Sequence, residues 1–194
     1  MEAKLFKIIM ILTLLANLSC KAQQEYPLLD TSPFDIPANT YMKDYNNQLD
    51  FYVGTWKASF DNKVYLLTIT KQIKKMLDYR NVYQDVLQVK YEVKTSNEIL
   101  TINSNIGAYV TNASDHHAIY SFGLKNNGSL AKLYYGGTNC GIGWGVIEFT
   151  KLNATQFNWK YSPNSSTIND DVCPPGQDLK IYLPITSNLV FTKQ

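Results

Sequence analysis

A regular alternation of apolar and polar side chains runs through most of the chain from Phe51 onward. In the segment 87–94, the odd-numbered residues from Leu87 to Val93 are apolar and the even-numbered residues are polar or charged. Successive side chains of a β-strand point to opposite faces, so this pattern is typical of strands with one buried and one wet face. About ten such segments occur, and none carries a helical stripe. The pattern predicts an all-β protein.

Turn motifs between these segments favour antiparallel pairing of neighbouring strands. Asn127-Gly128 lies between two alternating runs and predicts a hairpin, because a type I′ turn needs positive φ at both central residues. The last two strands are expected at 179–183 and 189–192. Many short strands joined by local turns predict an antiparallel up-and-down β-barrel, with a β-sandwich as the alternative.

The first 22 residues have the layout of an export signal. Lys4 and Lys7 precede an apolar run at 8–18, and small residues follow it. The run is too short for a transmembrane helix, which needs about 20 residues. We therefore expect 1–22 to be a signal peptide and the mature protein to lie outside the cytoplasm.

Two processing sites compete at the end of this signal. Cys20 and Ala22 fit ordinary cleavage before Gln23, whereas Leu18-Ser19-Cys20 looks like a degraded bacterial lipobox that would lipidate Cys20. A lipid on Cys20 is the only membrane contact expected. The extended lead-in at 23–50, which contains three prolines, is expected either to pack along the barrel domain at 51–194 or, if Cys20 is lipidated, to tether that domain to the membrane.

The charge balance argues against nucleic acid as a partner. Taking Glu2, Lys4, Lys7 and Lys21 away from the 18 basic and 16 acidic side chains leaves equal numbers of each. A mature chain without net charge has no field to attract a polyanion. The one local basic cluster is interpreted as a solvated strand edge, and it consists of Lys71, Lys74, Lys75 and Arg80.

Cys140 and Cys173 are the cysteines that remain after ordinary cleavage. An even pair in an oxidising compartment predicts a disulfide. A free catalytic thiol at Cys140 is the less favoured interpretation, because exported thiols tend to be paired.

No stretch of the sequence predicts a metal site, a cofactor or a catalytic centre. The glycine-rich run 136–145 is followed by a strand pattern rather than by the helix of a phosphate loop. Gly141, Gly143 and Gly145 are therefore expected on one strand face, where close packing near Trp144 is favoured over ligand binding. A hydrolase that uses His117 or the acidic loop at Asp171 is the least favoured function.

The segment Tyr52–Trp56 resembles the Gly-x-Trp start of the lipocalin-like barrels. The resemblance implies an eight-stranded cup whose closed end is plugged by Trp56 and whose open end admits an apolar ligand. Lipocalins usually pack an arginine of the last strand across this tryptophan. Here Arg80 lies in the middle of the chain, and the last strand offers only Lys193.

A wider set of segments is similar to a family of small exported bacterial proteins of unknown function. This likeness covers most of the mature chain and implies an extracytoplasmic location without an assigned activity. The segments are Tyr26-Pro27-Leu28, Asp35-Ile36-Pro37, Tyr41–Asp44, Tyr52–Trp56 and Leu189–Lys193.

The aromatic-rich alternating face suggests a non-catalytic barrel that binds a small apolar ligand or a cell-envelope component. The alternative is a structural or interaction module with a filled core. For the first hypothesis, the expected interior residues are Tyr52, Trp56, Phe60, Leu67, Ile69, Leu87, Val89, Tyr91 and Trp144.

Overall fold

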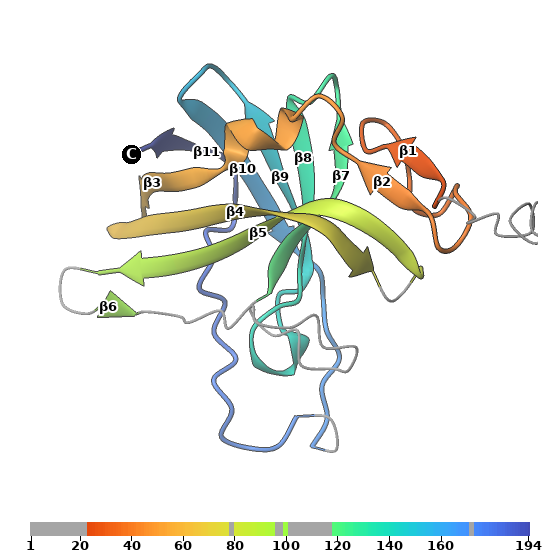
Figure 1. Cartoon of the computed structure of the whole chain (residues 1–194). Coiled ribbons are helices and arrows are strands. Elements are labelled where there is room, and N and C mark those ends of the chain that lie inside the picture. The colour runs from red at the N-terminus through yellow and green to blue at the C-terminus, as the bar shows by residue number, and fades with distance from the viewer. Residues whose placement is uncertain (1–22, 78–79, 96–98, 101–117, 171–172) are drawn as a thin grey trace, which may run out of the picture.

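The computed structural model describes residues 23–77, 80–95, 99–100, 118–170 and 173–194 (Figure 1). Residues 1–22, which include Cys20, as well as both histidines and Asp171, lie outside the described residues. The described residues contain two short 3₁₀-helices, η1 (Gln48–Tyr52) and η2 (Asn139–Gly141). The described strands are β1 (Glu25–Pro27), β2 (Tyr41–Lys43), β3 (Gly54–Phe60), β4 (Lys63–Leu77), β5 (Val82–Lys94), β6 (Ile99–Leu100), β7 (Ile119–Lys125), β8 (Leu130–Tyr135), β9 (Gly145–Lys151), β10 (Gln156–Pro163) and β11 (Thr186–Lys193).

Eight of these strands form a closed antiparallel barrel. Each barrel strand pairs with its neighbours along the chain in the order β3-β4-β5-β7-β8-β9-β10-β11, and β11 returns to β3 through Lys193 opposite Trp56. The predicted up-and-down barrel of lipocalin-like type is therefore confirmed. A single closed sheet also excludes the sandwich alternative.

The seam between β5 and β7 completes the closure. Gln88 lies opposite Tyr120 there, and the hydroxyl of Ser121 accepts a hydrogen bond from the Leu87 amide at 2.8 Å. The Ser121 side chain thus takes the place of a backbone acceptor at this seam.

The hairpin predicted at Asn127-Gly128 joins β7 to β8. Asn126, Asn127 and Gly128 all have positive φ, of 53°, 53° and 83°. The connection has four residues between the paired Lys125 and Leu130, rather than the expected two. Asparagine and glycine tolerate this left-handed backbone, which explains their presence in the turn.

The lead-in is packed onto the barrel instead of hanging from it. β1 pairs in parallel with β2, and β2 pairs in parallel with β5, where Tyr41 lies opposite Tyr83. Leu28 and Met42 of the lead-in are buried in the common core. The lead-in therefore packs along the barrel domain, and its chain is held in the sheet from Glu25 onward.

The expected strand at 179–183 is wrong. These residues belong to the long connection between β10 and β11 and pair with no strand of the described residues. Ile181, Tyr182 and Leu183 pack against the core from outside the sheet.

Candidate functional site

Tyr52 and Trp56 close the barrel at the end where η1 lies. Both side chains are fully buried, and the indole Nε1 of Trp56 donates to the Tyr52 carbonyl at 2.7 Å. The Tyr52 hydroxyl donates to the carbonyl of Gly128 at 3.2 Å, which connects η1 to the hairpin between β7 and β8. The tryptophan of the Gly-x-Trp segment therefore lies at a closed barrel end.

Lys193 occupies the place that an arginine usually takes in lipocalins. Its ammonium nitrogen lies 5.2 Å from the centroid of the Trp56 ring and donates to the Phe51 carbonyl at 3.2 Å. A lysine placed over an indole face makes the same kind of cation–π contact as an arginine.

Aromatic rings fill the next layer of the interior. The ring of Phe157 is 4.4 Å from that of Phe149, 4.6 Å from that of Trp56 and 5.5 Å from that of Phe191, measured between centroids. All four side chains have an exposed fraction of zero, so no water-sized space lies beside them.

Most of the predicted interior residues are inside the barrel. Their exposed fractions are at most one per cent, which agrees with the alternation of β4 and β5. The seven confirmed interior residues are Tyr52, Trp56, Leu67, Ile69, Leu87, Val89 and Tyr91.

The expectation that Phe60 lines the interior is wrong. Phe60 shares the strand face of Trp56 and Ala58, but it is 38% exposed. It is the last residue of β3 and lies opposite Lys63 at the start of β4, where the hairpin extends beyond the packed core.

The interior position expected for Trp144 is wrong as well. Trp144 is 41% exposed, and its indole Nε1 donates to the Ser165 carbonyl at 3.4 Å. β9 begins only at Gly145, so Gly141 and Gly143 belong to a turn rather than to a glycine-lined strand face.

Three tyrosines form the interior layer toward the opposite end of the barrel. The hydroxyl of Tyr91 lies 3.5 Å from that of Tyr135, and the Tyr161 hydroxyl donates to the Gly143 carbonyl. Burial raises the pKa of Tyr135 to about 12, and burial raises the pKa of Tyr91 and Tyr161 further. These phenols are neutral hydrogen-bonding groups at physiological pH.

A strap, defined here as residues 173–185, packs against this tyrosine end. Figure 1 shows the connection between β10 and β11 below the barrel, at the same end as η2. The indole Nε1 of Trp159 donates to the carbonyl of Pro184 at 3.0 Å, and Leu183 is buried in the core. The last part of the strap therefore packs against the barrel end opposite η1.

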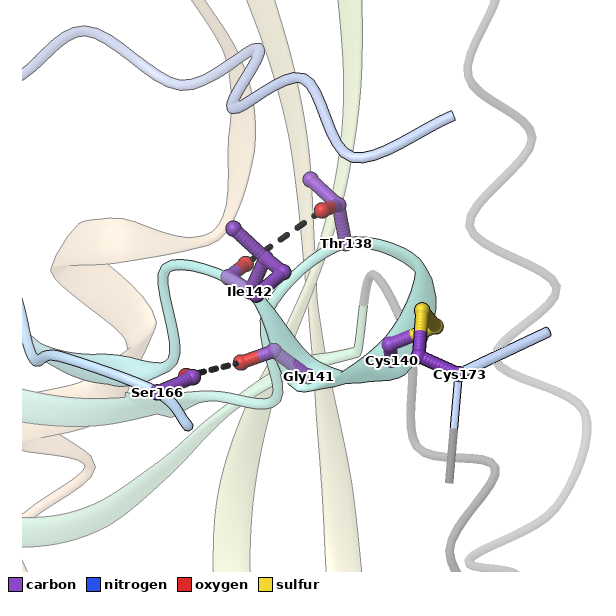
Figure 2. The surroundings of a disulfide bond; sticks show 6 residues. All are labelled: Thr138, Cys140, Gly141, Ile142, Ser166 and Cys173. Carbon is purple, nitrogen blue, oxygen red and sulfur yellow. Dashed lines mark hydrogen bonds between the residues drawn. A yellow bond between two sulfur atoms is a disulfide. The ribbon is translucent and has the colours of Figure 1, made fainter. Parts of the chain in front are cut away.

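The disulfide between Cys140 and Cys173 joins the strap to the η2 turn. It confirms the predicted pairing and links residues 33 positions apart (Figure 2). Close by, the Ser166 hydroxyl donates to the Gly141 carbonyl at 3.2 Å, and the Thr138 hydroxyl donates to the Ile142 carbonyl at 3.3 Å.

Two glycines of the η2 region permit this close packing. Gly137 has φ 85°, and a Cβ there would lie 2.5 Å from the Gly141 backbone. Gly143 has φ 76°, and a Cβ there would lie 2.8 Å from the Ile181 side chain. A side chain at Gly137 would push the two ends of the turn apart, and a side chain at Gly143 would push the strap away from the turn. The expected close packing thus occurs, through a turn.

A buried carboxylate holds the lead-in against a bulge in β4. Asp85 accepts hydrogen bonds from the Tyr41 hydroxyl at 2.6 Å and from the backbone amides of Asp44 and Lys74, each at 2.9 Å. The bulge lies between Gln72 and Lys75, and Asp85 faces it. Sequence reasoning missed this residue. Asp85 lies two residues before Leu87 on the same strand, so its side chain is expected on the same inward face.

A second buried carboxylate, Asp44, orients η1. It accepts from the amides of Gln48 at 2.9 Å and Leu49 at 3.0 Å and pairs with the Lys71 ammonium at 3.0 Å. Lys71 also pairs with Asp50 at 2.7 Å, and its side chain is only 13% exposed. The interpretation of Lys71 as part of a solvated edge is therefore wrong. Burial alone would lower the pKa of the Lys71 ammonium, but its hydrogen bonds to Asp50 and Asp44 outweigh burial and raise that pKa.

Replacing Asp85 by alanine is expected to lower the free energy of unfolding by about 2–3 kcal/mol, because three donors lose their acceptor in a buried place. Urea unfolding followed by tyrosine and tryptophan fluorescence measures the change. Asp35→Ala, at an exposed carboxylate of the lead-in, is the control and should stay within about 0.5 kcal/mol. Equal effects of both substitutions would show that the buried carboxylate does not hold the lead-in.

A shallow cavity of about 220 Å³ lies on the outer face of the barrel. It is lined by Thr68, Thr70, Gln88 and Lys90 of β4 and β5. Small-molecule pockets usually measure about 300–1,000 Å³ and are mostly apolar, so this polar cavity is smaller than such sites.

Within the described ranges, no three His, Cys, Asp or Glu side chains gather as a metal site. Nor does any helix of the part of the chain that the structure describes have the length and apolar character needed to cross a membrane.

The strand order and the plugged end define a closed, eight-stranded antiparallel barrel of lipocalin-like type. The chain belongs to the Family of unknown function (DUF6705), whose model matches residues 3–194. This membership agrees with the resemblance to a family without an assigned activity. No match to the chain is found among curated proteins or among solved structures. The disulfide is compatible with an extracytoplasmic location.

Proposed function

We propose that the protein is an exported, non-catalytic barrel that acts as an interaction module and meets a component of the cell envelope through its outer surface. The observation that carries the proposal is the packed interior around Phe157. An apolar ligand inside the barrel would have to displace rings that already contact one another at 4.4–5.5 Å. Close-packed interiors resist such displacement.

The chemistry of the buried polar groups supports a role without catalysis. Asp44 and Asp85 are both buried, and their carboxylate oxygens accept hydrogen bonds from backbone amides, from a lysine and from a tyrosine. Burial keeps the phenols of the tyrosine layer protonated. The two carboxylates are thus hydrogen-bonded within the fold, whereas an acid–base catalyst must reach a proton of its substrate.

Export rests on two observations that agree. The N-terminal segment has the charged start, short apolar run and small exit residues of a signal peptide. The disulfide between Cys140 and Cys173 suits an oxidising compartment, where such bonds persist.

Native mass spectrometry tests the closed interior against the competing hypothesis of a small apolar ligand. The purified protein is mixed with fatty acids and phospholipids, and non-covalent adducts are recorded. We expect the mass of the processed chain alone. A stoichiometric adduct that survives gentle desolvation would overturn the proposal in favour of a ligand-binding barrel.

A further inference from the structure

Tyrosine rings and lysine ammonium groups form a surface patch around the first described residues. β1, β2 and β5 bring them together, since Glu25 lies opposite Tyr41 and Tyr41 lies opposite Tyr83. We call this surface the N-terminal patch; it comprises Glu25, Tyr41, Lys43, Tyr45, Ile73, Lys74 and Tyr83.

The lysines of the N-terminal patch lie over its rings. The ammonium nitrogen of Lys74 is 5.5 Å from the ring centroid of Tyr41 and 5.7 Å from that of Tyr83. The Lys43 ammonium nitrogen is 5.3 Å from the ring centroid of Tyr45. Each lysine thus places its ammonium group over a tyrosine ring, as in a cation–π contact.

The patch holds two lysines and one carboxylate, Glu25, and Tyr41 also donates to the buried Asp85. Its exposed apolar side chains are Tyr45 and Ile73, whereas Tyr41 is buried. Glu25 neutralises Lys43, at 3.1 Å, and also accepts from the Tyr45 hydroxyl. Lys74 makes no salt bridge within the residues described, although its charge also acts on Glu25. Tyr45 is 52% exposed, and Ile73, which precedes Lys74 in the β4 bulge, is 59% exposed.

The patch lies where the N-terminal segment enters the fold. The Gln23 side chain donates to the Asn39 carbonyl at 2.9 Å, and the Tyr41 amide donates to the Gln24 carbonyl at 2.9 Å. Cys20 is three residues before Gln23, a reach of at most about 10 Å. A lipid on Cys20 would therefore bring this side of the barrel directly to the membrane.

Groups of this kind suit the surface of a bilayer. Tyrosine rings and the long stems of lysines prefer the headgroup level, and each basic side chain there attracts anionic lipid. A single lipid chain holds a protein weakly unless a second signal adds to it. We propose that the N-terminal patch docks on an anionic phospholipid bilayer. This inference rests on the proposed function, because it names the partner of the outer surface.

Vesicle flotation tests the docking without any lipid on the protein. The chain from Gln23 onward, which contains the whole barrel and its lead-in, is mixed with two kinds of vesicle. One kind holds phosphatidylcholine and phosphatidylglycerol in equal parts, and the other holds phosphatidylcholine alone. Both carry a trace of radiolabelled lipid. We expect the protein to float with the anionic vesicles and to remain below with the neutral ones.

Lys74→Gln is expected to weaken partition into the anionic vesicles about five-fold, since one basic side chain near the surface is lost. Its backbone amide still donates to Asp85, so the bulge is kept. Ile73→Ser should weaken partition as well. The matched control is Lys57→Gln, which replaces an exposed lysine of β3 and should leave partition unchanged. Figure 1 shows β3 on the opposite side of the barrel from β1 and β2.

Three outcomes contradict the account, and they are distinguishable. Protein that stays below the anionic vesicles without label overturns the docking and leaves the proposed function standing. If Lys74→Gln and Lys57→Gln weaken partition into the anionic vesicles equally, docking at this patch is also overturned. Protein that stays below and carries labelled lipid has extracted a ligand, which overturns the closed interior of the proposed function.

Discussion

Phe157→Ala is expected to lower the free energy of unfolding by about 3–5 kcal/mol, the usual cost of removing a fully buried ring. Phe157 contacts the rings of Phe149, Trp56 and Phe191, which come from three other strands of the barrel. Removing it leaves a void among them, because a close-packed interior relaxes only in part. Urea unfolding of the oxidised protein measures the change.

Phe60→Ala is the matched control, because it removes the same ring from a position that is 38% exposed. Its cost should be no more than about 1 kcal/mol. If the two substitutions destabilise the protein equally, or if Phe157→Ala costs less than about 1 kcal/mol, the interior is not the packed core described above.

Removal of the disulfide has the second large effect. The double substitution Cys140→Ser and Cys173→Ser is expected to lower the free energy of unfolding by about 3–4 kcal/mol, because the bond closes a loop of 33 residues. The barrel itself should persist, since Trp159 still bonds to Pro184 of the strap. Far-ultraviolet circular dichroism should therefore keep its sheet signal.

A reducing agent supplies the control for the disulfide. It should destabilise the unmodified protein by the same amount and leave the double variant unaffected. If the reductant leaves the free energy of unfolding of the unmodified protein unchanged, the disulfide does not stabilise the fold as described.

Much of the barrel follows from the alternation of side chains along single strands. The parity of Leu87, Val89 and Tyr91 predicts their inward direction without knowledge of the partner strands, and their burial confirms it. The Cys140–Cys173 pairing follows from the number of cysteines and the expected compartment.

The alternation of inward and outward positions along a strand does not show where that strand leaves the core. Phe60 lies on the same strand face as Trp56, yet it is exposed because the β3–β4 hairpin extends past the packed layer. Nor does an alternating sequence distinguish a strand from a strap: the backbone of 179–183 pairs with no described strand, and Ile181, Tyr182 and Leu183 all pack against the core. Both differences depend on neighbours that are distant in sequence.

The buried polar groups were detectable but were not recognised. Lys71 has the inward parity of Leu67 and Ile69, and Asp85 has that of Leu87. A charged residue in an inward position is a sign of a buried pair or hydrogen-bond network, since an unpaired buried charge is costly. Here each meets a partner from the lead-in, Asp44 in the case of Lys71 and Tyr41 in the case of Asp85.

The central claim is that the barrel interior is filled by its own side chains, and xenon-129 nuclear magnetic resonance tests it most directly. Xenon enters apolar voids that water leaves empty. The Phe157→Ala variant, with its engineered void, is the positive control and should shift the xenon resonance in a saturable way. The unmodified protein is predicted to show only weak, non-saturating surface interaction. A saturable interior site in the unmodified protein would contradict the account and indicate a barrel built to hold a ligand.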